Sequence, residues 1–213
     1  LEILAPGAGR MVEVGHAFLE QARRLLADQR PANMVLIRGF GRYPELPQMA
    51  AVYGLKALGI AGYPMYCGVA VAVGMDIVQS GWDLESAYQV LQERFTEYDF
   101  VYLHIKKTDS AGEDGDFDRK VQLLEEIDGY IPRFRELRPD VLIVTGDHST
   151  PSTMLSHSWH PVPLVLASDR DIPDAAASFS ERGCRQGSIG TIPASSLMAL
   201  ALAHAGRLQK YGA

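Results

Sequence analysis

Carboxylates are concentrated in one glycine-containing segment of the sequence. Residues 108–116 read Thr-Asp-Ser-Ala-Gly-Glu-Asp-Gly-Asp and include the carboxylates of Asp109 and Glu113. The two glycines allow the backbone to turn tightly, so that several carboxylates can point into one space. The alternative is a solvated acidic loop whose last residue, Asp116, caps a helix that begins near Phe117. The segment by itself leaves both interpretations open.

Imidazoles and a further carboxylate stand in a second segment. Asp147 and His148 directly follow an apolar run, and His157 comes later in the same stretch. An Asp-His pair also occurs in purely structural loops, so the pair does not by itself establish a site. Oxygen and imidazole ligands without thiolates suit manganese, magnesium or zinc, and two such ions about 4 Å apart form the usual clamp for phosphoryl transfer. The ligand types are therefore typical of a divalent-metal site.

The elements that must position these segments alternate between helices and strands. The pattern predicts a helix over 12–29 and a buried strand over 34–37, followed by a Gly- and Arg-containing loop. Further helices are predicted at 50–56, 64–73, 84–96 and 117–137, and further strands at 58–61, 76–78, 100–105, 141–145 and 164–167. This rhythm indicates an α/β fold with a mainly parallel sheet flanked by helices. Ligands of such sheets gather at the carboxyl ends of strands, so the loops at 106–116 and 146–161 are the expected functional region.

The composition limits the classes of function. With 47% hydrophobic and 22% charged residues, the 213-residue chain is expected to fold in water. A net charge of -6 argues against binding to nucleic acid or anionic membranes, which both need clustered Lys and Arg. The sequence has no apolar run long enough for a membrane span and no signal pattern. Cys67 and Cys184 match no zinc-ligand spacing and favour a reducing compartment, so a cytoplasmic location is expected.

Five segments together resemble a known family. They are residues 36–42, 109–116, 145–151, 157–163 and 179–190, and the most specific is Thr-Gly-Asp-His-Ser-Thr-Pro at 145–151. In this order they resemble the motifs of the archaeal type of 2,3-bisphosphoglycerate-independent phosphoglycerate mutase, in the alkaline phosphatase superfamily. The resemblance implies an alkaline phosphatase-like fold and corresponds to the C-terminal portion of the family's chain.

The resemblance also implies a reaction and its cofactors. The family interconverts 3-phosphoglycerate and 2-phosphoglycerate through a phosphoserine, and two divalent ions activate the serine. By similarity, one ion would be held by Asp109, Glu113 and His157, and the other by Asp147 and His148. Manganese or magnesium is expected, with zinc or cobalt left open. No serine of this chain lies in the family's nucleophile motif, so the catalytic serine is expected upstream and the isolated chain is expected to be inactive.

The resemblance divides the chain in two. Residues 1–74 resemble the end of a substrate-binding domain inserted by the family, with a hinge, and 75–213 resemble the C-terminal part of the metal-binding domain. In the first part, Arg38 and Arg42 are candidate contacts for the phosphate or carboxylate of phosphoglycerate, because guanidinium groups fit both. A surface salt bridge is the alternative for each arginine. A homo-oligomer is left open.

Three positions depart from the family's pattern. Glu113 stands where a histidine is usual, and Cys67 and Val71 stand where basic residues are common. Loss of basic groups would weaken the binding of an anionic substrate. Two other functions therefore stay open: a degenerate, non-catalytic relative that serves in binding or assembly, and another metal-dependent phosphatase of the superfamily.

Overall fold

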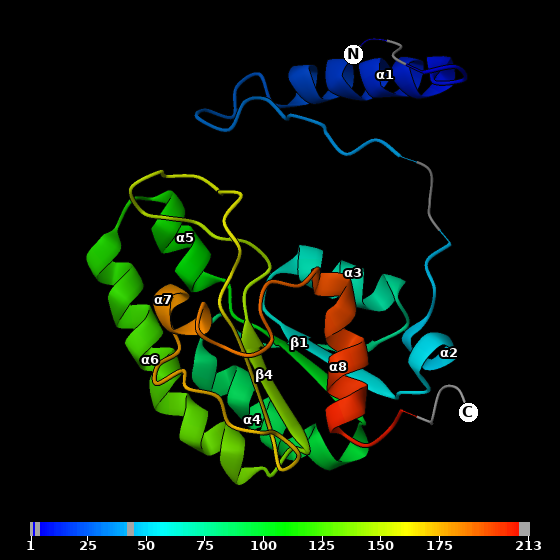
Figure 1. Cartoon of the computed structure of the whole chain (residues 1–213). Coiled ribbons are helices and arrows are strands. Elements are labelled where there is room, and N and C mark those ends of the chain that lie inside the picture. Colours follow the sequence, from blue (N-terminus) through cyan, green and yellow to red (C-terminus); the bar gives the residue numbers. More distant parts are fainter. Residues whose placement is uncertain (1, 3–4, 42–44, 209–213) are drawn as a thin grey trace. The chain divides into compact units, whose positions relative to one another are not determined.

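The chain forms two compact units, Leu1–Glu45 and Leu46–Ala213, and a computed structural model describes residues 2, 5–41 and 45–208 (Figure 1). The first unit contains the helix α1 (Gly9–Leu25), which lies within the range predicted for it except at its first turn. The strand predicted over 34–37 is wrong: these residues have no regular structure, and Leu36 is 96% exposed. A strand needs a hydrogen-bonded neighbour. In the described part of this unit, α1 is the only regular element and offers none.

The second unit alternates between helices and strands. Its elements are α2 (Met49–Tyr53), β1 (Ala57–Ala61), α3 (Pro64–Ala72), β2 (Asp76–Gln79), α4 (Leu84–Arg94), η1 (Phe95–Glu97), β3 (Phe100–His104), α5 (Lys107–Glu113), α6 (Phe117–Glu136), β4 (Val141–Thr145), β5 (Leu164–Ser168), α7 (Glu181–Cys184), η2 (Ala194–Ser196) and α8 (Leu197–His204).

The strand β1 lies at the centre of a parallel sheet with the order β2-β1-β3. All of its residues are buried. Ala57 packs with Ala70 of α3, whereas Leu58 and Ile60 pack against α4. Because successive side chains of a strand point to opposite faces, α3 and α4 cover opposite faces of the sheet. This confirms the predicted fold class, an α/β fold with a parallel sheet flanked by helices.

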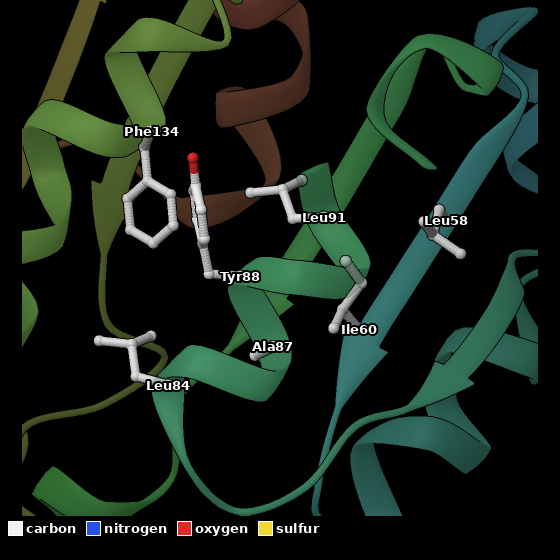
Figure 2. Packing of buried hydrophobic residues seen from close by; sticks show 7 residues of the cluster. All are labelled: Leu58, Ile60, Leu84, Ala87, Tyr88, Leu91 and Phe134. Atoms are coloured by element: carbon white, nitrogen blue, oxygen red, sulfur yellow. The ribbon is translucent and has the colours of Figure 1, made fainter. Parts of the chain in front are cut away.

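The larger hydrophobic core lies between β1 and the helices α4 and α6 (Figure 2). Leu58 and Ile60 are fully buried, and burying one such side chain stabilises the fold by about 1.5–3 kcal/mol. Their partners are Leu84, Ala87, Tyr88 and Leu91 of α4 and Phe134 of α6. This packing holds α6 against the sheet.

The strands β4 and β5 are antiparallel and pair from Val141↔Ser168 to Thr145↔Leu164. The pairing closes residues 146–163 into a loop at the end of β4. An isolated bridge between Ser149 and Ser158 brings the two sides of that loop together.

The two compact units divide after Glu45, earlier than the boundary at residue 74 suggested by the resemblance. The reason is that β1 pairs with both β2 and β3, which ties residues on both sides of position 74 into one sheet. The assignment of residues 1–74 to an inserted domain stays a prediction.

Among the described residues, no helix combines the length and the apolarity needed to cross a bilayer.

Candidate metal centre

The acidic segment after β3 is largely a helix. Residues 106–116 were expected to form a loop, but Lys107–Glu113 form α5. The helix cannot be recognised from the local sequence, because its stability comes from tertiary packing and not from helix propensity. Ala111 and Gly112 are buried, and a Cβ added to Gly112 would lie 2.4 Å from the carbonyl oxygen of Thr150. The helix places Asp109 and Glu113 four positions apart, so both carboxylates face the same side.

Asp116 caps the next helix, as the alternative interpretation of the acidic segment expected. Its carboxylate accepts a hydrogen bond from the backbone N–H of Arg119 at 2.9 Å. Between the two helices Gly115 has a φ of 73°, which favours glycine. One acidic segment thus provides a helix cap and two carboxylates directed toward the candidate centre.

The loop between β4 and β5 brings two imidazoles together. The rings of His148 and His157 stack with their centroids 3.7 Å apart and an interplanar angle of 29°. Both rings lie beside Asp109, whose Oδ1 is 3.5 Å from His157 Nε2 and 3.8 Å from His148 Nδ1. Ligand atoms of these three residues all lie within 4.8 Å of one another.

The other two candidate ligands lie on either side of this trio. Glu113 Oε1 is 3.4 Å from His157 Nε2, and Asp147 Oδ2 is 3.6 Å from His148 Nε2. The structure thus brings all five candidates into one continuous group. Their role as metal ligands stays a prediction.

Asp109 is the most enclosed carboxylate of the group, with its side chain 14% exposed. Burial by itself raises the pKa of this carboxyl group, but hydrogen bonds from Lys106 and Thr150, together with the charge of Lys106 and the nearby His148, outweigh burial and lower the pKa below its usual value. Thr150 is buried, and its hydroxyl group also lies 3.1 Å from His148 Nδ1. Asp109 is therefore ionised at neutral pH and held in a fixed orientation.

Asp147 is similarly held, but by a neutral donor. Burial raises the pKa of Asp147, but the hydrogen bond from the hydroxyl group of Tyr66, a backbone hydrogen bond and the nearby imidazoles of His148 and His104 together outweigh burial, so the pKa is lowered overall. Burial and the same hydrogen bond raise the pKa of Tyr66, because the phenolate form would face a carboxylate.

The donor set fits divalent ions. Ligand atoms about 2.0–2.2 Å from one ion stand about 3.0–3.5 Å from each other. The separations of His157 Nε2 from Asp109 and Glu113, 3.5 and 3.4 Å, lie in this range. Carboxylate and imidazole donors suit manganese, magnesium and zinc.

Three residues of the site were not singled out from the sequence: Tyr66, Lys106 and Thr150. Lys106 follows β3, and Tyr66 lies in the first turn after β1, so both stand at carboxyl ends of parallel strands. That position is the signal that could have identified Lys106 and Tyr66. Of the candidate substrate-binding arginines, Arg38 lies in the compact unit Leu1–Glu45 and Arg42 lies outside the described residues.

Comparisons with known proteins agree with the resemblance found in the sequence. Residues 4–204 match the metalloenzyme superfamily. A probable 2,3-bisphosphoglycerate-independent phosphoglycerate mutase of Thermotoga neapolitana is 47% identical over 204 residues, covering 96% of this chain and 51% of the relative. A protein with the same description from Aquifex aeolicus is 45% identical and covers 98% of this chain and 51% of the relative. The chain spans about half the length of the curated relatives it matches.

Two solved structures resemble the chain. The PH0037 protein from Pyrococcus horikoshii has a TM-score of 0.89 and 30% identity, over 98% of this chain and 60% of that one. A cofactor-independent phosphoglycerate mutase from Thermoplasma acidophilum has a TM-score of 0.64 and 26% identity, over 95% of this chain and 54% of that one. With a match over residues 4–204, the chain belongs to the metalloenzyme superfamily, and its resemblance to cofactor-independent phosphoglycerate mutases is confirmed.

Proposed function

We propose that this chain supplies the metal-binding part of a cofactor-independent phosphoglycerate mutase that acts on phosphoglycerate. The observation that carries the proposal is the convergence of Asp109, from helix α5, with His148 and His157, from the loop between β4 and β5. It is supported by the match to relatives described as probable mutases over nearly the whole chain.

The residues divide between two divalent ions. Asp109, Glu113 and His157 would hold one, and Asp147 and His148 would hold the other. Such ions supply positive charge that offsets the charge of a transferring phosphoryl group. Lys106 and Thr150 keep Asp109 ionised and oriented, and the buried Thr150 also contacts His148, so it links the two groups of ligands.

The proposal also specifies the metal, the residues that contact the substrate, the origin of the catalytic serine and the location of the protein. Manganese or magnesium is the expected metal, because three of the five ligands are carboxylates. Arg38 and Arg42 are proposed to contact the substrate, and the serine that carries the phosphoryl group is proposed to come from a segment other than these 213 residues. A cytoplasmic location is part of the same proposal.

Calorimetric titration of the chain with Mn²⁺ tests the proposal. The unaltered chain is expected to bind Mn²⁺, and Asp109→Asn is expected to weaken binding by about tenfold or more, since even the partners of metal ligands contribute that much. Asp114→Asn is the matched control: it removes the same charge from an exposed residue that adjoins α5. Equal affinities of the two variants for Mn²⁺ would show that Asp109 is not a metal ligand.

A second titration addresses the substrate. With Mn²⁺ present, the chain is expected to bind 3-phosphoglycerate more tightly than glycerate, because the phosphate is the group that the ions attract. Metal binding without this preference would argue against a phosphoglycerate site. Release of free phosphate from 3-phosphoglycerate would instead favour the phosphatase alternative.

A further inference from the structure

Tyr66 joins two distant parts of the second unit at the candidate metal centre. Its hydroxyl group donates a hydrogen bond of 2.7 Å to Asp147 Oδ2, across 81 positions of the sequence. Tyr66 lies in the first turn of α3, whereas Asp147 lies just after β4. The contact therefore connects the helix that follows β1 to the loop that carries three candidate ligands.

Contacts other than the hydrogen bond to Asp147 fix the orientation of the Tyr66 ring. It stacks on the imidazole of His104 with the centroids 3.6 Å apart and an interplanar angle of 25°. His104 ends β3, so its position is fixed by the parallel sheet. Pro64 begins α3, and the backbone N–H of Tyr66 donates a hydrogen bond to the carbonyl oxygen of Tyr63 at 3.1 Å. The direction of the phenol is therefore set by secondary structure and stacking.

Both oxygens of Asp147 are engaged, although its side chain is 53% exposed. Oδ1 accepts a hydrogen bond from the backbone N–H of His148 at 3.1 Å, and Oδ2 accepts the bond from Tyr66. Without the phenol, an exposed aspartate would sample several rotamers, and binding an ion would cost the entropy of fixing one. A phenol orients the carboxylate without neutralising it, whereas Asp109 is paired with the cation of Lys106.

We propose that Tyr66 is a positioning residue that orients the carboxylate of Asp147 for metal binding. The inference rests on the proposed metal site and adds a residue that acts through a ligand. Hydrogen-bonded partners of metal ligands typically contribute about 10- to 100-fold to metal affinity. Tyr66→Phe keeps the ring that stacks on His104 and removes only the hydroxyl group.

A double-mutant cycle with Mn²⁺ titration tests the role of Tyr66. Tyr66→Phe is expected to weaken Mn²⁺ binding about tenfold, and to have no further effect in an Asp147→Asn background, because the hydroxyl acts only through that carboxylate. Equal weakening in both backgrounds, or no weakening in either, would overturn the proposal. In addition, Mn²⁺ is expected to change the tyrosine ultraviolet absorbance of the unaltered chain, and this signal is expected to disappear in Tyr66→Phe.

Tyr130→Phe is the matched control. Tyr130 also donates a 2.7 Å hydrogen bond to a carboxylate, Glu85, away from the site. Both variants are expected to lower the melting temperature slightly, and only Tyr66→Phe should change Mn²⁺ affinity. An unaltered chain that binds no Mn²⁺ would refute the proposed function itself. Normal binding that Asp109→Asn weakens and Asp147→Asn does not would refute the role of Asp147, and that of Tyr66 with it.

Discussion

The imidazole rings of His148 and His157 stack at 3.7 Å between centroids, on opposite sides of one loop between β4 and β5. The bridge between Ser149 and Ser158 lies next to both histidines and sets their separation. Stacking lets the two imidazoles turn their nitrogens toward different carboxylates: His157 Nε2 lies near Glu113, and His148 Nε2 lies near Asp147. This arrangement suits two neighbouring ions.

His157→Ala should weaken Mn²⁺ binding to the chain by about tenfold or more, because His157 Nε2 lies within 3.5 Å of oxygen atoms of both Asp109 and Glu113. His160→Ala is the control. His160 is in the same loop, but it hydrogen-bonds Ser158 and stacks on Trp159. Calorimetric titration of both variants measures the difference, and a similar loss in His160→Ala would point to collapse of the loop.

Glu113→His should shift metal preference toward zinc or cobalt, because imidazole is a softer ligand than carboxylate. The change also removes a negative charge from the site, so the metal-loaded protein should bind phosphoglycerate more tightly. Competition between Zn²⁺ and Mn²⁺ measures the first effect. Glu125→His, on an exposed part of α6, controls for an added surface histidine. An unchanged preference would show that Glu113 belongs to the solvated acidic segment.

The 213-residue chain by itself should not interconvert 3-phosphoglycerate and 2-phosphoglycerate at any Mn²⁺ concentration. None of its serines lies in the nucleophile motif of the family it resembles. The assay follows the appearance of 2-phosphoglycerate, with a complete mutase as the positive control. Turnover that survives further purification would mean that a serine of this chain takes the phosphoryl group.

Gly112→Ala should destabilise the chain by about 1–3 kcal/mol, as overpacking of a well-packed site does. The added Cβ would lie 2.4 Å from the backbone oxygen of Thr150, which cannot move without shifting the loop that carries His148. Gly129→Ala is the control, because it lies on α6 with open space around a Cβ. That change should stabilise the helix by about 1 kcal/mol. Urea unfolding measures both, and equal stabilities would contradict the packing of α5 on Thr150.

Glu85→Gln should lower the melting temperature at neutral pH. Hydrogen bonds from Arg133 and Tyr130 lower the pKa of Glu85 to about 2. Because the pKa is lower in the folded state, the ionised carboxylate stabilises the fold above the usual carboxyl pKa of about 4.3. This contribution is lost as the pH falls toward 2.

Thermal unfolding at several pH values measures this effect. The difference in melting temperature between the unaltered chain and Glu85→Gln should be full at pH 7 and shrink between pH 4.5 and 2. Glu93→Gln, on the exposed side of the same helix α4, should show a smaller difference. A difference for Glu85→Gln that does not depend on pH would mean that the ion pair contributes nothing measurable.

Local patterns in the sequence were sufficient for most elements of the second unit. The apolar run at β1 predicts a buried strand because helices cover both faces of a parallel sheet, and Pro64 and Asp116 mark the starts of helices. These signals act within a few residues of the chain. They also place Asp109, Asp147 and His148 in segments that follow strands, where sites in such folds are built.

Tertiary structure decided what short-range signals do not encode. The segment 34–37 has the apolar composition of a strand but lacks a neighbour in its described unit, and α5 forms because Gly112 lets Thr150 approach. The hydrogen bond from Tyr66 to Asp147 depends on how α3 packs across the sheet toward the end of β4. The sequence by itself determined which residue types stand at the strand ends. Packing decided which of their atoms meet, because contacts between distant segments depend on the whole arrangement of the sheet and its helices.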